Sequence, residues 1–136
     1  MNKALLLAAV AALTLIAPAT ATAESAPGCA SVKQIGATAY LTIDGETAAS
    51  VKQFLGCGKN FGYVYVWQAW AAAHPRFDAT AGIMPDEGGE LGKVYGAIGQ
   101  REVWSKGTST TGQCTKALGI VGLGDPAWGK YTERRC

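Results

Sequence analysis

The stretch FGYVYVWQAW, residues 61–70, carries the clearest strand pattern in this chain. Aromatic and β-branched residues favour strands, and successive side chains of a strand point to opposite faces of its sheet. The aromatic side chains therefore share one face and the valines the other, with Phe61, Tyr63, Tyr65 and Trp67 opposed to Val64 and Val66. A strand over the whole stretch would be long, so we place it in the middle of a sheet.

Residues 37–43 alternate strictly between apolar and polar side chains, which is typical of a half-buried strand. The Asp44-Gly45 pair that follows indicates a hairpin turn. A two-residue loop would put Ser50 on the apolar side, so the sequence favours a three-residue loop with a type I turn and a bulge. In that register Leu41 pairs with Ala49.

Similar patterns, separated by turn residues, predict strands along the rest of the chain. Residues 71–76 are expected to form a loop, because Pro75 disfavours helical geometry at His74. The expected fold class is all-β: a small antiparallel β-sandwich or partly open barrel of about seven to eight short strands. The expected strands are 37–43, 47–55, 61–70, 77–83, 92–98, 101–106, 114–123 and 128–134.

Residues 1–23 have the pattern of an export signal. Lys3 supplies the positive start, an apolar run follows, and Ala21-Thr22-Ala23 forms a small-residue cleavage site. The apolar run is shorter than a bilayer-spanning helix needs, and no later stretch is longer, so no membrane anchor is expected. Cleavage leaves a single domain, residues 24–136, that is secreted and extracellular, or periplasmic where an outer membrane retains it.

The cysteine count predicts that two disulfides staple this domain. An even number of cysteines in an exported chain is typical of disulfides rather than of free thiols. Three pairings are open, and we prefer the two that join cysteines nearest in sequence, Cys29 with Cys57 and Cys114 with Cys136. No C-x-x-C spacing occurs and His74 is far from every cysteine, so neither a metal nor another cofactor is expected.

The charge balance argues against a nucleic-acid partner. The formal net charge is only +2, and one of the basic residues, Lys3, belongs to the export signal. Arg134 and Arg135 are adjacent, but two arginines do not make the basic patch that binds phosphate backbones.

No catalytic residue is expected, and the protein is predicted not to be an enzyme. His74 is the single histidine, and no serine lies in a G-x-S-x-G motif. Asp86, Glu87 and Glu90 are close in sequence, as glycosidase carboxylates can be. They flank two glycines in a polar turn, where no burial would raise the pKa of one of them to make an acid.

The aromatic residues are the best candidates for a ligand-binding site. Rings on a flat sheet can stack on sugars or anchor a protein contact, and we expect Tyr63, Tyr65, Trp67 and Trp70 to do so. The same rings could instead form a wall of the core. Because buried tyrosine hydroxyls need partners, Tyr63 and Tyr65 are expected to point outward or to lie at the margin.

The expected function is therefore that of a secreted, non-catalytic binding module for a glycan, cell-envelope or protein ligand. One alternative is a secreted inhibitor or toxin that presents the loop Pro85–Glu90 or Gly107–Gly112 to a protein target. The other alternative is a small extracellular hydrolase that uses His74 and Glu87.

Overall fold

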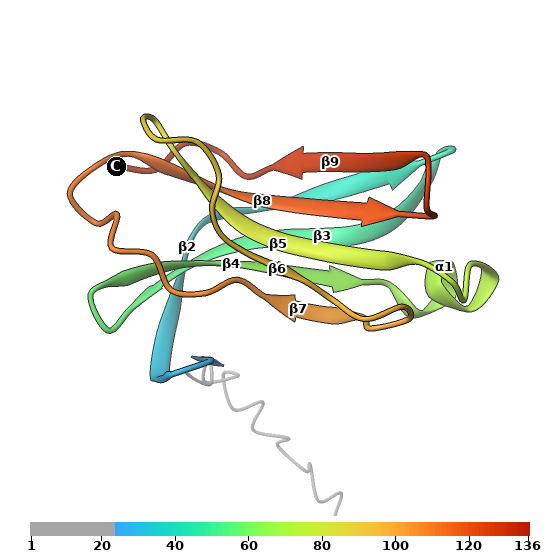
Figure 1. Cartoon of the computed structure of the whole chain (residues 1–136), viewed down its shortest axis with the longest axis horizontal. Helices are drawn as coiled ribbons and strands as arrows, with labels where there is room; N and C mark the ends of the chain where they lie inside the picture. Colours follow the sequence, from blue (N-terminus) through green and yellow to red (C-terminus); the bar gives the residue numbers. More distant parts are fainter. Residues whose placement is uncertain (1–23) are drawn as a thin grey trace, which may run out of the picture.

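The computed structural model describes residues 24–136, which form two antiparallel sheets packed face to face (Figure 1). The larger sheet has the strand order β1-β2-β3-β4-β7 and the smaller one β6-β5-β8-β9. The elements are β1 (Glu24–Ala26), β2 (Cys29–Ile43), β3 (Glu46–Gly56), β4 (Lys59–Val66), α1 (Gln68–Ala73), β5 (Asp78–Pro85), β6 (Leu91–Tyr95), β7 (Glu102–Trp104), β8 (Thr115–Gly122) and β9 (Ala127–Tyr131). The all-β sandwich is thus confirmed, with one side curled into a half-barrel.

The export signal predicted for residues 1–23 lies outside the described residues. From residue 24 onward, no helix has the length and apolar character needed to cross a membrane.

The main core lies between the two sheets. Val64 and Val66 of β4 are fully buried there, and they pack with buried residues of β5 and β8. Gly119 of β8 lets the sheets approach closely, because a Cβ at this position would collide with the side chain of Val51. The even-numbered face of the central strand is therefore the sandwich core, and its aromatic face points away from the smaller sheet.

The β2–β3 hairpin has the expected register but a different turn. Leu41 pairs with Ala49, as predicted. The loop, however, contains only Asp44-Gly45, whose φ angles of 50° and 80° are those of a type I′ turn. The extra residue is a bulge in β3 at Ala48, between the pairs of Thr42 with Thr47 and of Leu41 with Ala49. The three-residue loop was wrong because the strand, not the turn, accommodates the additional residue.

The central strand is shorter than predicted, because β4 ends at Val66 and the chain continues into α1. Trp67 is the N-cap residue, and its carbonyl oxygen accepts the hydrogen bond of the Ala71 N–H at 2.9 Å. Alanine is the best helix former, and Pro75 follows the C-cap residue His74, so the proline ends the helix rather than preventing it. The predicted loop at residues 71–76 was therefore wrong for residues 71–73, which are helical, and right for residues 74–76.

The first part of β2, together with β1, was not predicted. Gly36 has a φ of 72°, and the register of β2 against β3 shifts between Ile35 and Ala39, so the strand bulges at this point. The N–H of Ala37 is freed by the bulge and donates to Glu133 Oε1 at 2.9 Å. Ahead of the bulge, β2 turns away from the sandwich toward β1 (Figure 1).

The preferred disulfide pairing is confirmed. Cys29, the first residue of β2, is bonded to Cys57 in the β3–β4 turn. Cys114, just before β8, is bonded to Cys136 in the segment after β9. Two formed disulfides fit an oxidising environment such as the outside of a cell.

Candidate aromatic binding face

Two cross-strand rows place four aromatic residues on the outer surface of the larger sheet. Residues paired across neighbouring strands share a face. One row runs Tyr40–Ser50–Tyr65–Glu102 over β2, β3, β4 and β7, and the other runs Lys52–Tyr63–Trp104 over β3, β4 and β7. We call the surface formed by Tyr40, Tyr63, Tyr65, Trp67 and Trp104 the aromatic face.

One half of the aromatic face is supported by a second, smaller core. The Tyr63 and Trp104 rings have centroids 4.6 Å apart, and Phe54 lies 5.0 Å from Trp104. Phe54 and Phe61 lie on the same face beside these rings and are buried against residues of β1 and the start of β2. Tyr63 is only 9% exposed, so this half offers mainly the Trp104 ring to solvent.

The other half of the face is open. Trp67 reaches back across β3, where its Nε1 donates a hydrogen bond to Ser50 Oγ at 3.0 Å. Its ring makes an edge contact with Tyr40 on β2, with centroids 6.5 Å apart. Trp67 is 43% exposed and Tyr40 53%, so two large rings are available to a ligand here.

The polar groups of three of the five rings, those of Tyr63, Tyr65 and Trp67, have hydrogen-bond partners within the protein. The Tyr63 hydroxyl donates to Glu102 Oε1 at 2.5 Å, and burial, reinforced by this carboxylate, raises the pKa of Tyr63 far above its ordinary value. The Arg101 guanidinium donates from Nη2 to the Tyr65 hydroxyl at 2.5 Å and from Nε to the Val66 carbonyl at 3.0 Å. It also lies 5.0 Å from the centroid of the Tyr65 ring. These bonds fix the orientations of Tyr63, Tyr65 and Trp67 before any ligand arrives.

An open hollow of about 390 Å³ lies beside Trp104. It combines aromatic ring surface with charged hydrogen-bonding groups of both signs, and is lined by Glu24, Ser25, Lys52, Tyr63, Glu102 and Trp104. Its volume falls within the range of small-ligand sites. The hollow can therefore accept a group that has an apolar face and a polar rim.

The structure brings together three of the four predicted binding residues. Tyr63, Tyr65 and Trp67 all belong to the aromatic face, with exposure that increases in that order. Trp70 does not, because it lies on α1 and is 1% exposed in the sandwich core. Its ring stacks on His74 with centroids 4.2 Å apart.

Other members of the site were missed at the sequence level. Tyr40 occupies the polar side of the alternating stretch 37–43, which was a usable signal. Trp104, Arg101 and Glu102 reach the face only because β7 pairs with β4, and this pairing joins segments that are far apart in sequence.

Of the residues considered for the hydrolase alternative, His74 and Asp86 make structural contacts, and Glu87 is exposed. His74 Nδ1 is 2.9 Å from the carbonyl oxygen of Trp70, so in this geometry the Nδ1–H donates. Asp86 accepts hydrogen bonds from Arg134, and these lower the pKa of Asp86, which is the opposite of what a general acid needs. Over residues 24–136, no group of three or more metal-binding side chains is found.

The two loops of the inhibitor alternative are both anchored. Loop 107–112 is held by Thr108, whose N–H donates to the Asn60 carbonyl at 2.9 Å, and by Thr110, whose hydroxyl accepts from Asn60 Nδ2 at 2.9 Å. Both threonines are buried. Loop 85–90 is tied to the segment after β9 through Asp86 and Arg134.

Comparison of the chain with protein-family models finds no match, and neither does a search of curated proteins or of solved structures.

Proposed function

We propose that this protein is a secreted, non-catalytic binding module that holds an extracellular glycan on its aromatic face. The observation that carries the proposal is the open pair of rings, Trp67 and Tyr40, which contact each other edge to face. Trp67 and the nearby Tyr65 are also held by hydrogen bonds. Sugar rings have apolar C–H faces that stack on aromatic rings, and they have hydroxyl groups around their rims. The aromatic face offers both kinds of contact.

Pre-organisation favours binding here. A ligand that must order flexible side chains loses part of its binding free energy to their conformational entropy. Trp67 is already bonded to Ser50 and Tyr65 to Arg101, so little ordering remains to be done. The Glu102 and Lys52 side chains, in the hollow beside Trp104, supply acceptors and donors for sugar hydroxyls.

An extracellular location agrees with this proposal. Both disulfides fit an oxidising compartment, and extended glycans are components of cell surfaces and of the surrounding medium. Where the exporting cell has an outer membrane, the same module would act in the periplasm.

The experiment is a pulldown on insoluble chitin, cellulose and peptidoglycan with the purified oxidised protein. We expect retention on at least one of these and a loss of about tenfold or more in affinity for Trp67→Ala and Tyr40→Ala. Tyr95→Ala is the matched control, because Tyr95 is 71% exposed but lies on β6 of the other sheet. Circular dichroism of each variant verifies the fold.

Failure of all three polysaccharides to retain the protein, followed by the same result on a glycan array, would sink the proposal. Capture of a protein ligand that depends on Trp67 and Tyr40 would assign the face to protein recognition instead. Equal retention of the wild type, Trp67→Ala and Tyr95→Ala would place the glycan site elsewhere.

A further inference from the structure

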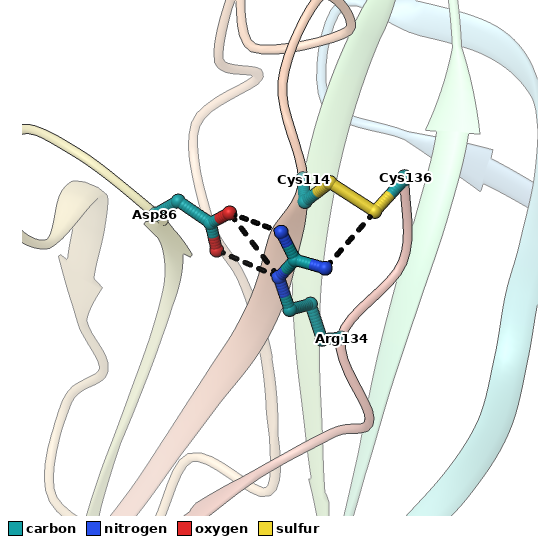
Figure 2. Close-up of polar contacts among 4 residues, drawn as sticks. All are labelled: Asp86, Cys114, Arg134 and Cys136. Atoms are coloured by element: carbon teal, nitrogen blue, oxygen red, sulfur yellow. Dashed lines mark hydrogen bonds and ion pairs between the residues drawn. A yellow bond between two sulfur atoms is a disulfide. The ribbon is translucent and has the colours of Figure 1, made fainter.

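The Cys114–Cys136 disulfide lies at the surface beside a fixed positive charge. Arg134 Nη1 is 3.4 Å from Cys136 Sγ. Cys136 is exposed and Cys114 half-buried, so a small thiol can reach the bridge from solvent. Figure 2 shows the guanidinium between the carboxylate of Asp86 and the sulfur of Cys136.

Asp86 determines where the guanidinium points. Arg134 Nε donates to both carboxylate oxygens of Asp86, at 3.0 and 3.1 Å, and Nη2 donates to Oδ2. The Arg guanidinium is planar and presents its donors in a rigid fork. With Nε and Nη2 engaged, Nη1 is left facing the sulfur (Figure 2).

The second disulfide has a different environment. Cys29 is 4% exposed and packs in the smaller apolar core with Val32 and Phe54. Among the described residues, no arginine or lysine side chain forms a hydrogen bond with Cys29 or Cys57 sulfur, and the contact of Cys29 Sγ is to the Ser31 carbonyl oxygen. Cys57 is exposed, like Cys136, so the two bridges of one domain differ chiefly in nearby charge.

We infer that Cys114–Cys136 is a thiol–disulfide exchange site, in which Arg134 orients toward Cys136 and stabilises it as the departing thiolate. An external thiolate attacks Cys114 Sγ and forms a new S–S bond, the Cys114–Cys136 bond breaks, and its electron pair leaves on Cys136 Sγ. A second thiol of a dithiol reductant then attacks the mixed disulfide and releases Cys114 as a thiolate. The reductant becomes a disulfide, and the two protein sulfurs gain two electrons.

The direction of attack follows from the charge. Exchange is faster when the leaving thiol is the better thiolate, and a neighbouring arginine stabilises that form. Arg134 is a positioning residue, because it acts on the sulfur without exchanging bonds itself.

The exchange is local, because backbone hydrogen bonds also hold the segment after β9. Thr115 N–H donates to the Arg135 carbonyl at 2.7 Å, and Arg135 N–H donates to the Thr115 carbonyl at 2.8 Å. Thr132 N–H donates to the Ala117 carbonyl at 3.0 Å. The bridge can therefore open and close while β8 and β9 stay paired.

The test measures reduction of each bridge by dithiothreitol at fixed pH, with aliquots quenched by iodoacetamide and mapped by peptide mass spectrometry. We expect Cys114 and Cys136 to be alkylated before Cys29 and Cys57. We expect Arg134→Gln to slow opening of Cys114–Cys136 by at least about threefold. Arg135→Gln is the matched control, since the neighbouring arginine pairs with Glu133 instead, and it should leave the rate within experimental error.

A second arm uses glutathione on the wild-type protein alone, so it does not depend on whether a variant folds. The expected first product carries glutathione on Cys114 and a free thiol on Cys136, which the iodoacetamide quench then alkylates. Glutathione on Cys136 would overturn the direction of exchange. Equal rates of Cys114–Cys136 opening in the wild type and Arg134→Gln would overturn the proposal that this bridge is an exchange site. Opening of Cys29–Cys57 before Cys114–Cys136 would overturn it as well.

Discussion

The indole Nε1 of Trp67 donates a hydrogen bond to the hydroxyl of Ser50 at 3.0 Å, and so joins the N-cap of α1 to the middle of β3. The bond directs the Trp67 ring across the sheet toward Tyr40 on β2. A small side chain at position 50 leaves room for the indole, and its oxygen fixes the ring orientation.

Ser50→Ala should weaken ligand binding while leaving the fold intact. A hydrogen bond of this kind contributes about 1 kcal/mol, so we expect affinity for a retained glycan to fall roughly fivefold. Titration calorimetry gives the affinity, and urea unfolding gives the stability. An unchanged affinity would mean that the orientation of Trp67 does not depend on Ser50.

Trp70→Ala tests the assignment of Trp70 to the core. Because the side chain is 1% exposed and packs on Phe77 and His74, its removal should lower the free energy of unfolding by about 3–5 kcal/mol. Trp67→Ala, at an exposed position, should cost much less. Comparable losses in the two variants, measured by urea denaturation, would contradict the distinction between core and face.

The Asp86–Arg134 pair predicts a pH dependence of stability. The guanidinium holds the pKa of Asp86 below its ordinary value, so the folded state binds this proton less readily than the unfolded state. Its stabilisation is present above the unfolded-state pKa of about 4 and is lost as pH falls through the lower folded-state value. Urea unfolding at pH 7 and pH 3 should show a smaller acid-induced loss for Asp86→Asn than for the wild type. Identical losses would exclude a contribution from this pair.

Removing the two disulfides should have unequal effects. The bridges span 28 and 22 residues, and chain entropy alone assigns each about 3–4 kcal/mol. Cys29 is also buried in the smaller apolar core, whereas neither Cys114 nor Cys136 is buried. Cys29→Ser with Cys57→Ser should therefore lower the thermal midpoint more than Cys114→Ser with Cys136→Ser. The reverse order would contradict the role of Cys29 in that core.

The sequence predicted those features that depend on local alternation or on neighbouring cysteines. The apolar side of residues 37–43 selected the pairing of Leu41 with Ala49. The alternation could not show where the extra residue lies. A bulge in β3 at Ala48 and a three-residue loop both pair Leu41 with Ala49.

The structural features that the sequence did not predict depend on tertiary contacts. Residues 29–36 alternate poorly and become a strand only through pairing with β1 and β3. The helix α1 is too short to show a helical period, and it is stabilised by the burial of Trp70. Half of the aromatic face likewise depends on β7 pairing with β4, which brings Trp104 beside Tyr63.

Both outer strands of the larger sheet, β1 and β7, are only three residues long. Unpaired backbone groups on an edge strand are a template on which another chain can add, and a short edge offers few of them. A sheet that shows several large rings to solvent would otherwise be at risk of fibrous self-association. The short edge strands are therefore expected to limit strand addition to the larger sheet, even though the rings of Tyr40 and Trp67 are exposed on it.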